Sequence, residues 1–232
     1  AIQPMVEEFT VLNPDKYVED KSSPMHGNLA AANSQVVKKD LPSSIENKQN
    51  LIYDTTASNL KSLTPTLDNM KSKGYEIIMI MVYAHPIISF LRNFKRERKV
   101  PAVGVIGTWT NVYLLMGEYK KMFGDRFMLV ASPASTQEEA DKVEEFTKAY
   151  ENGNLKSFFM DMINSGEYES SFRKSDDGLS PEELEKREKS REKTVQATEV
   201  NVDKLVGAYK QIADNLDPME VGELPQKLGQ FI

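Results

Sequence analysis

The sequence predicts an α/β fold, with a mostly parallel sheet flanked by helices and a helical C-terminal region. Four short apolar segments, rich in Val, Ile, Leu or Tyr, predict the strands: residues 9–13, 50–54, 75–83 and 126–131. Stretches with helical periodicity separate them, as they do in parallel sheets built from strand–helix–strand units. Because the four runs are almost continuously apolar, we expect strands that are covered on both faces.

The segments between these strands carry the start and stop signals of helices. The helices predicted before residue 131 cover residues 28–39, 42–48, 58–73 and 104–123, with a further one that begins at Pro86. Proline lacks an N–H group and disfavours the helical conformation of the residue before it, so Leu41-Pro42 predicts a break between the first two helices.

After residue 131 the strand signals stop and charged, helix-forming sequence takes over. We therefore divide the chain into an α/β core at residues 1–131 and a helical region at residues 132–232. The helices expected in the second part are residues 135–150, 155–164, 180–196 and 200–216, with a polar loop at residues 165–180. Ser180 and Glu183 have the spacing of a capping box, which marks a helix start.

Composition excludes several classes of protein. The 232 residues include no cysteine, which rules out disulfides, Cys-ligated zinc and a cysteine nucleophile. No apolar run approaches the roughly 20 residues that span a bilayer, so we expect no membrane segment and a soluble, cytoplasmic protein. The net charge of −6 argues against a surface that attracts nucleic acid throughout. With only two histidines, a His-rich metal site has little material, and His85 is interpreted as a strand-end residue.

Asp15 is the first candidate for chemistry, because it directly follows the first predicted strand in the turn Asn13-Pro14-Asp15. Ligands of open α/β sheets bind at the carboxyl ends of the strands, where an aspartate can accept a proton from a hydroxyl or hold a substrate. Asn-Pro-Asp is also ordinary turn sequence, so both interpretations stay open.

Asp54 closes the second predicted strand and is followed by Thr55 and Thr56. A carboxylate at the tip of an apolar strand, followed by small hydroxyl side chains, can reach a Mg²⁺ shell directly or through water. Asp54 could equally cap the next helix. Because Asp15 and Asp54 end two strands of one predicted sheet, we expect both to face one cleft.

Three arginines follow the third predicted strand: Arg92, Arg96 and Arg98, within the cationic segment RNFKRERK. Arg92 and Arg96 are four residues apart and share a helix face. Guanidinium groups near strand ends can clamp phosphates and stabilise charge in phosphoryl transfer. A solvated cationic face is the alternative.

These motifs resemble zeta-toxin-like and polynucleotide-kinase-like P-loop kinases. The succession VLNPDKYVED, NLIYDTTASN and KSKGYEIIMIMVYAHPIISFLRNFKRERKVP, then a helix with the single tryptophan before FGDRFMLV, carries the resemblance over about residues 1–131. It implies a substrate-side acid or base at Asp15, an acid near Mg²⁺ at Asp54 and lid arginines among Arg92, Arg96 and Arg98. ATP and Mg²⁺ are then the expected cofactors.

One family motif is missing, the phosphate-binding loop G-x-x-x-x-G-K-[ST], which occurs nowhere in the chain. Residues 1–8 resemble the end of the helix that follows such a loop, so we expect the loop immediately upstream of residue 1. An incomplete record, proteolytic processing and a protein that has lost ATP binding are the three explanations.

The sequence therefore predicts an ATP-dependent phosphotransferase that acts on a hydroxyl of a small molecule, a sugar nucleotide or a polynucleotide end. Its expected partners are a nucleotide and that acceptor. The alternative is a non-catalytic structural or interaction protein that kept a kinase-like sheet and binds a protein partner through its charged C-terminal helices.

Overall fold

The computed structural model describes residues 9–96, 100–164, 180–213 and 216–231. The chain forms two compact units, residues 1–77 with 222–232 and residues 78–221. The boundary predicted at residue 131 falls inside the second unit, within a strand. The division into a core at residues 1–131 and a helical region at residues 132–232 stays a prediction.

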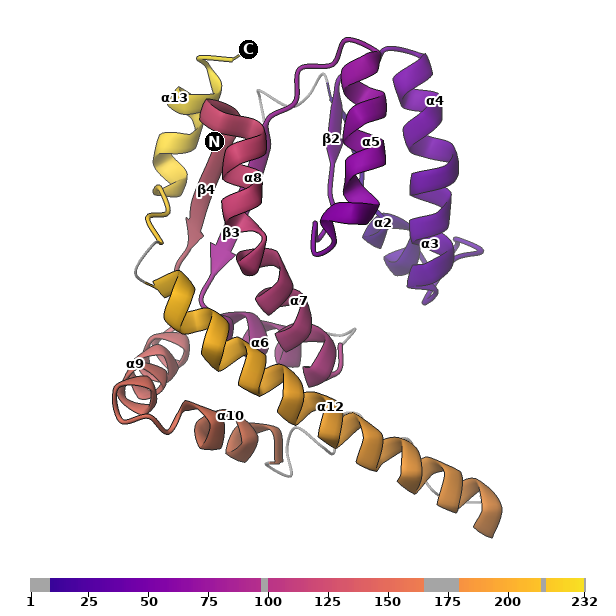
Figure 1. The fold of residues 1–232 in the computed structure, drawn as a ribbon. Coiled ribbons are helices and arrows are strands. Elements are labelled where there is room, and N and C mark those ends of the chain that lie inside the picture. Colours follow the sequence, from indigo (N-terminus) through magenta and orange to yellow (C-terminus); the bar gives the residue numbers. More distant parts are fainter. Residues whose placement is uncertain (1–8, 97–99, 165–179, 214–215, 232) are drawn as a thin grey trace. The chain divides into compact units, whose positions relative to one another are not determined.

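The first unit is built on two parallel strands, β1 (Thr10–Leu12) and β2 (Leu51–Tyr53). Between them the chain forms α2 (Asp15–Glu19), α3 (Leu29–Gln35), the π-helical turn η1 (Val36–Asp40) and α4 (Leu41–Glu46), and β2 leads into α5 (Leu60–Ser72) (Figure 1). The buried core cluster consists of Leu12, Val36, Leu41, Ile45 and Met70.

The break predicted at Leu41-Pro42 is wrong, because α3, η1 and α4 form one continuous helical run. The N–H of Leu41 donates to the carbonyl of Val36, five residues back, which makes this turn wider than an α-helical one. A proline ring clashes with the carbonyl four residues earlier in a regular α-helix. The wide turn makes room for Pro42, and the helix continues.

The second unit holds two parallel strands, β3 (Met79–Ala84) and β4 (Phe127–Ser132), which pair over all six residues. Helices α6 (Pro86–Lys95), α7 (Ala102–Leu114) and α8 (Met116–Phe123) and the 3₁₀ turn η2 (Gly124–Arg126) lie between these strands in sequence. Met219 forms a parallel bridge to Val130, so the chain after the last predicted helix adds to the sheet. The parallel α/β fold class predicted from the sequence is confirmed, as two separate strand pairs.

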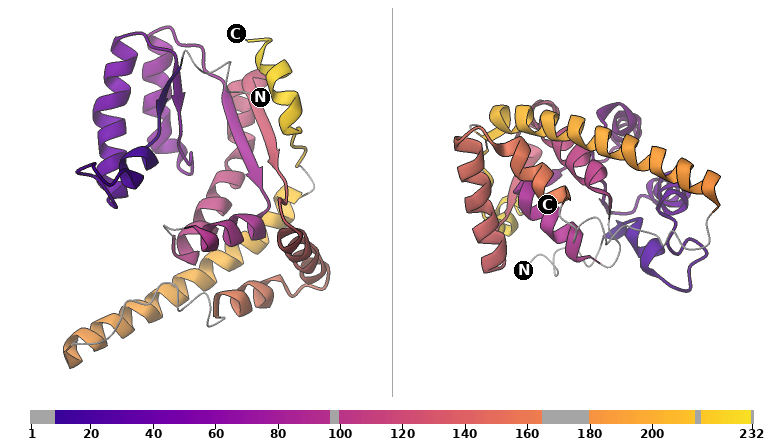
Figure 2. Two further views of the ribbon diagram at one scale, coloured as in Figure 1. Left: turned by 180° about the vertical axis from the view of Figure 1, so that it is seen from behind. Right: turned by 90° about the horizontal axis from the view of Figure 1, so that it is seen from below.

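The C-terminal helices of the second unit are α9 (Gln137–Glu151), α10 (Leu155–Asn164) and α12 (Pro181–Ala213). Two helices were predicted where α12 is a single 33-residue helix. Its second half packs against α7 and buries Val202, Leu205, Ala208 and Ile212. Its first half extends past the other helices of this unit (Figure 2). The predicted capping box forms: Ser180 N–H donates to Glu183 Oε2 at 2.9 Å, and Glu183 N–H donates to Ser180 Oγ at 3.3 Å.

Beyond α12 the chain ends in η3 (Val221–Glu223) and α13 (Leu224–Leu228). The polar loop predicted at residues 165–180 lies outside the described residues, apart from Ser180. Among the described residues, no helix is long and apolar enough to cross a membrane.

Burial differs from the prediction at β1, where Val11 is 46% exposed, and at β3. Ile80 is 42% exposed and Val82 is 60% exposed, so this strand is not covered on both faces. Met81, between them, is buried, so exposure alternates along the strand even though the sequence is continuously apolar.

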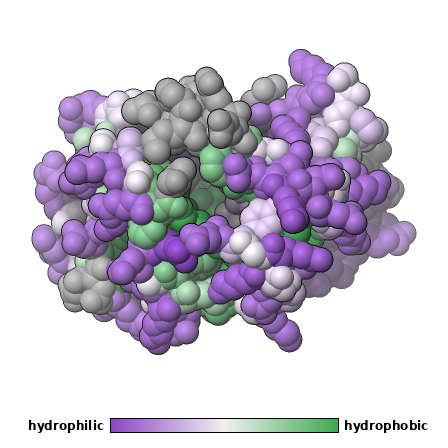
Figure 3. Space-filling model, turned by 90° about the horizontal axis from the view of Figure 1, so that it is seen from above, coloured by the Kyte–Doolittle hydropathy of each residue, from purple (hydrophilic) through white to green (hydrophobic). Residues whose placement is uncertain are grey.

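Figure 3 shows one face of the molecule, on which hydrophilic side chains predominate around a smaller apolar area.

Candidate functional site

The carboxyl ends of β1 and β2 meet at one edge of the first unit. Leu12 pairs with Tyr53, and the backbone N–H of Asp54 donates to the carbonyl oxygen of Leu12 across 3.0 Å. The turns that follow the two strands therefore start side by side. The predicted meeting of the Asp15 turn with Asp54 depends on this register.

Asp15 lies in the first turn of α2, immediately after β1. Its N–H donates to the side-chain oxygen of Asn13 across 2.8 Å, which closes the turn around Pro14. Val18, at 2% exposure, anchors the short helix in the core. The Asn-Pro-Asp sequence is thus a genuine turn, and this turn presents Asp15 beside the strand end.

The two carboxylates are close enough to affect each other. Burial by neighbouring protein atoms and, second, the negative charge of Asp15 raise the pKa of the Asp54 carboxyl above its ordinary value. Asp54 nevertheless remains accessible to solvent. A partly desolvated carboxylate with a like charge nearby favours a bound proton or a cation.

The chain after Asp54 folds into a tight turn. The N–H of Ala57 donates to Thr55 Oγ1 at 3.4 Å, and Ala57 itself has a left-handed backbone with φ 50°. The side-chain oxygen of Asn59, not that of Asp54, caps α5 by accepting from the N–H of Ser62 at 3.2 Å. The cap interpretation of Asp54 is therefore wrong. Thr55 and Thr56 are exposed in the turn beside it.

Tyr17 and Asp40 belong to the same neighbourhood, although the sequence analysis did not identify them. Tyr17 Oη donates to Asp40 Oδ2 across 2.6 Å. The residues are 23 positions apart and carry no recognisable motif. Pro42 within a helical pattern was the one available signal, since it coincides with the π-helical turn that carries Asp40.

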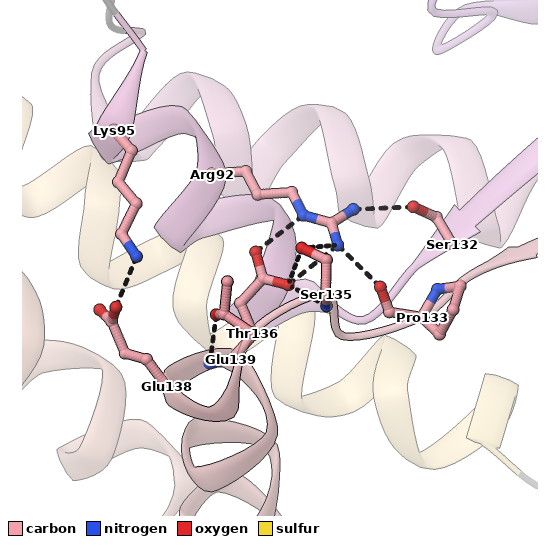
Figure 4. Close-up of polar contacts among 8 residues, drawn as sticks. All are labelled: Arg92, Lys95, Ser132, Pro133, Ser135, Thr136, Glu138 and Glu139. Carbon is pink, nitrogen blue, oxygen red and sulfur yellow. Dashed lines mark hydrogen bonds and ion pairs between the residues drawn. The ribbon is translucent and has the colours of Figure 1, made fainter.

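Arg92, from α6 in the second unit, is held by protein groups (Figure 4). Its Nε and Nη2 each lie 2.9 Å from the Glu139 carboxylate, and the guanidinium also donates to Ser132 Oγ and to the carbonyl of Pro133, both at 2.7 Å. Glu139 is only 3% exposed and also accepts from the N–H of Ser135. The Arg92 hydrogen bonds and the Ser135 N–H lower the pKa of Glu139 to about 2. Arg92 thus fixes the connection between β4 and α9.

The other two arginines lie at and beyond the end of α6. Arg96 is exposed at the C-cap, and Arg98 lies outside the described residues. Asp15 and Asp54 belong to the first unit, while Arg92 and Arg96 belong to the second. A cleft shared by the acids and the arginines therefore stays a prediction.

His85 follows β3 and caps α6, as expected for a strand-end residue. Its Nδ1 accepts from the N–H of Ile87 at 3.4 Å, and its Nε2 lies 3.4 Å from Tyr209 Oη. The ring stacks edge-on against Phe146, with centroids 4.4 Å apart. Burial lowers the pKa of His85 to about 4, so the imidazole is neutral at pH 7.

Candidate metal ligands are sparse in the described part of the chain. Across residues 9–96, 100–164, 180–213 and 216–231, no three His, Cys, Asp or Glu side chains form a group that could hold a metal ion. Mg²⁺ in nucleotide sites usually takes one or two carboxylates and completes its shell with phosphates and water. Asp54 and Asp15 are neighbouring carboxylates of this kind, and a Mg²⁺ site there stays a prediction.

Comparison with known proteins finds a family match over the region that contains the candidate residues. The model of the zeta toxin family matches residues 13–105, which run from the turn after β1 into α7. No curated protein and no solved structure matches the chain. The matched span includes Asp15, Asp54, Arg92 and Arg96. The resemblance predicted from the sequence is therefore confirmed as a similarity to the zeta toxin family over residues 13–105.

Proposed function

We propose that this protein takes part in ATP-dependent phosphoryl transfer to a hydroxyl of a small molecule, a sugar nucleotide or a polynucleotide end. The observation that supports it best is the pair Asp15 and Asp54, at adjacent strand ends within the zeta-toxin-like span. Kinase-like chemistry is what the family match suggests at its coarsest level. The acceptor and the residue roles are the proposed part.

Asp15 is the proposed base. Its carboxylate accepts the proton of the acceptor hydroxyl as the hydroxyl oxygen forms a bond to the γ-phosphorus, and the bond from that phosphorus to the β–γ bridging oxygen breaks to release ADP. Bound Mg-ATP supplies the transferable phosphoryl group. Because the turn around Pro14 is closed by Asn13, the base starts in a defined position, which favours the reactive geometry.

Asp54 is the proposed acid of the Mg²⁺ shell, with the hydroxyls of Thr55 and Thr56 as further polar groups beside it. Its raised pKa shows that the ionised form is disfavoured by burial and by Asp15. A divalent cation would relieve both effects, since it stabilises two neighbouring negative charges. The residues present therefore fit a magnesium ion shared with phosphate oxygens.

ATP itself needs further groups. The backbone amides and lysine of a phosphate loop are absent from the 232 residues, so ATP binding is conditional on such a loop outside them. Arg96 and Arg98 are proposed to neutralise the migrating phosphoryl group. Arg92 would first have to leave Glu139 and the Pro133 carbonyl, so we propose it for this role only after such a rearrangement.

A second candidate is a protein-interaction role for α12. The first half of this helix is almost entirely exposed and is stabilised by ion pairs along its own length, such as Lys189–Glu185 at 2.6 Å. A charged, solvated helix of this kind can present side chains to a partner without unfolding the rest of the unit. This role would belong to a non-catalytic protein or would accompany catalysis.

The proposed function is tested with the full-length protein, γ-labelled ATP and a panel of hydroxyl acceptors of the three classes. We expect labelled product, and we expect Asp54→Asn to raise the Mg²⁺ concentration needed for half-maximal rate by roughly tenfold or more. Asp68→Asn, an exposed aspartate on α5, is the matched control and should leave that concentration unchanged. Full-length protein that contains no phosphate loop and transfers no label would contradict the kinase and favour the interaction role.

A further inference from the structure

The π-helical turn η1 creates a side-chain contact that an α-helix cannot make. Gln35 Nε2 donates to Asp40 Oδ1 at 2.9 Å, across five positions. In an α-helix, residues five apart point about 140° away from each other, because 3.6 residues complete a turn. The wider turn, closed by the bond from Leu41 N–H to the Val36 carbonyl, brings them to one side.

The second oxygen of this carboxylate holds Tyr17. Tyr17 Oη donates to Asp40 Oδ2 at 2.6 Å, so each oxygen of Asp40 accepts from a different side chain. The hydrogen bond to Asp40, followed by burial and the Asp40 charge, raises the pKa of Tyr17 to about 12. The phenol therefore stays protonated and keeps donating throughout the range in which enzymes work.

Tyr17 lies two residues after Asp15, on the same short helix. Helix α2 has five residues and no side-chain cap, and a helix of that length is not stable without tertiary contacts. Its contacts with the body of the first unit include the buried Val18 and the Tyr17 ring, which packs on the core cluster. Asn13 holds the start of the helix through the Asp15 N–H, and the Val18 carbonyl accepts from the N–H of Gly27 at 3.0 Å near its end. A further directional contact from the middle of the helix would hold the helix against small rotations.

We propose that the Tyr17–Asp40 hydrogen bond is this further contact and that Tyr17 and Asp40 are positioning residues for Asp15. This inference rests on the proposed function, because it assigns the pair a part in orienting the proposed base. A charge-assisted hydrogen bond is directional and stronger than a neutral one. Small displacements of a reacting group reduce rates strongly, whereas ground-state binding of a nucleotide elsewhere does not depend on them.

The test removes one hydroxyl and keeps the ring. Tyr17→Phe retains the packing on the core and loses only the bond to Asp40. Tyr75→Phe is the matched control, because Tyr75 packs on the same core cluster and its hydroxyl donates to the backbone carbonyl of Gln49 at 3.0 Å, away from α2. Asp40→Asn keeps an acceptor oxygen without its charge and should give an intermediate effect.

In the full-length protein we expect Tyr17→Phe to lower kcat for phosphoryl transfer about tenfold, with KM for ATP within twofold of wild type. In the 232-residue chain, hydrogen exchange at the amides of Tyr17 and Val18, which bond to the Pro14 carbonyl, should accelerate by a similar factor. Tyr75→Phe should change neither quantity.

The two measurements separate the possible failures. An active wild-type enzyme whose kcat is unchanged in Tyr17→Phe would overturn the positioning role alone. An inactive full-length wild type would overturn the proposed function and, with it, any catalytic part for the pair. Unchanged hydrogen exchange in Tyr17→Phe would show that the bond does not hold α2, and this too would overturn the inference.

Discussion

The N–H of Asp54 donates to the carbonyl oxygen of Leu12 across 3.0 Å, which brings the ends of two parallel strands into register. The Asp15 turn and the Asp54 turn begin at this bond, and the negative charge of Asp15 helps to raise the pKa of Asp54. Ordinary backbone pairing thus produces the acid pair on which the proposed function depends.

Loss of the Glu139 charge should destabilise the second unit. Glu139→Gln leaves the Arg92 guanidinium with a weaker partner in a mostly buried site, which we expect to cost on the order of 3 kcal/mol. Glu138→Gln is the control. The Glu138 carboxylate, next to Glu139 in sequence, pairs with Lys95 on the surface, and this ion pair should contribute less than about 1 kcal/mol. Urea unfolding of both variants measures the difference, and equal midpoints would contradict the structural role of Arg92.

Acidification should destabilise the second unit through His85. Its folded pKa of about 4 is below the ordinary 6.5, so the unfolded chain takes up the proton more readily. The stability contributed by neutral His85 is complete above about pH 6.5 and is lost as pH falls toward 4. We expect a loss of about 2 kcal/mol between pH 7 and pH 5 that is absent in His85→Asn, which can still cap α6. The free energy of unfolding at the two pH values tests this, and parallel profiles would contradict it.

Replacing Lys48 with glycine should stabilise the first unit. It follows α4 with φ 52°, in a C-terminal motif where Lys48 N–H bonds to the Ile45 carbonyl and Gln49 N–H to the Ser44 carbonyl. A left-handed backbone strains any residue with a Cβ, and glycine relieves that strain. We expect Lys48→Gly to raise the free energy of unfolding of the first unit by about 1 kcal/mol. Lys48→Ala controls for loss of the side chain and should show no gain, and a gain of equal size in both variants would point away from the backbone.

The strands could be predicted from the sequence because short apolar runs rich in Val, Ile, Leu and Tyr favour buried strands. The four runs became β1, β2, β3 and β4, and Ser180 with Glu183 marked the start of α12 correctly. The proline rule failed at Pro42, since the π-helical turn that accommodates the ring depends on tertiary contacts. The break predicted near residues 197–199 failed because no glycine or proline lies there, and Thr198 is buried within one continuous helix.

The positions of the candidate residues were predictable only where those residues directly follow a strand. Asp15 and Asp54 each come just after a strand, so their approach follows from parallel pairing. The partners of Arg92 and Tyr17 lie 47 and 23 residues away, respectively, and no local pattern indicates them. Cationic sequence around Arg92 suggested phosphate binding, whereas the folded chain surrounds that guanidinium with its own oxygen atoms. Long-range pairing of this kind becomes visible only in three dimensions.

The most direct test of the acid pair is the kinetics of Asp15→Asn in the full-length protein, with Asp20→Asn as the control. Asp20 is exposed just after α2, and its carboxylate serves a local turn with Ser22. If Asp15 accepts the hydroxyl proton, Asp15→Asn should lower kcat by roughly 10²-fold or more while calorimetry finds the Kd for Mg-ATP within twofold of wild type. Asp20→Asn should match wild type in both measurements. A kcat for Asp15→Asn within threefold of wild type, in an otherwise active enzyme, would contradict the proposed role of Asp15 as the base.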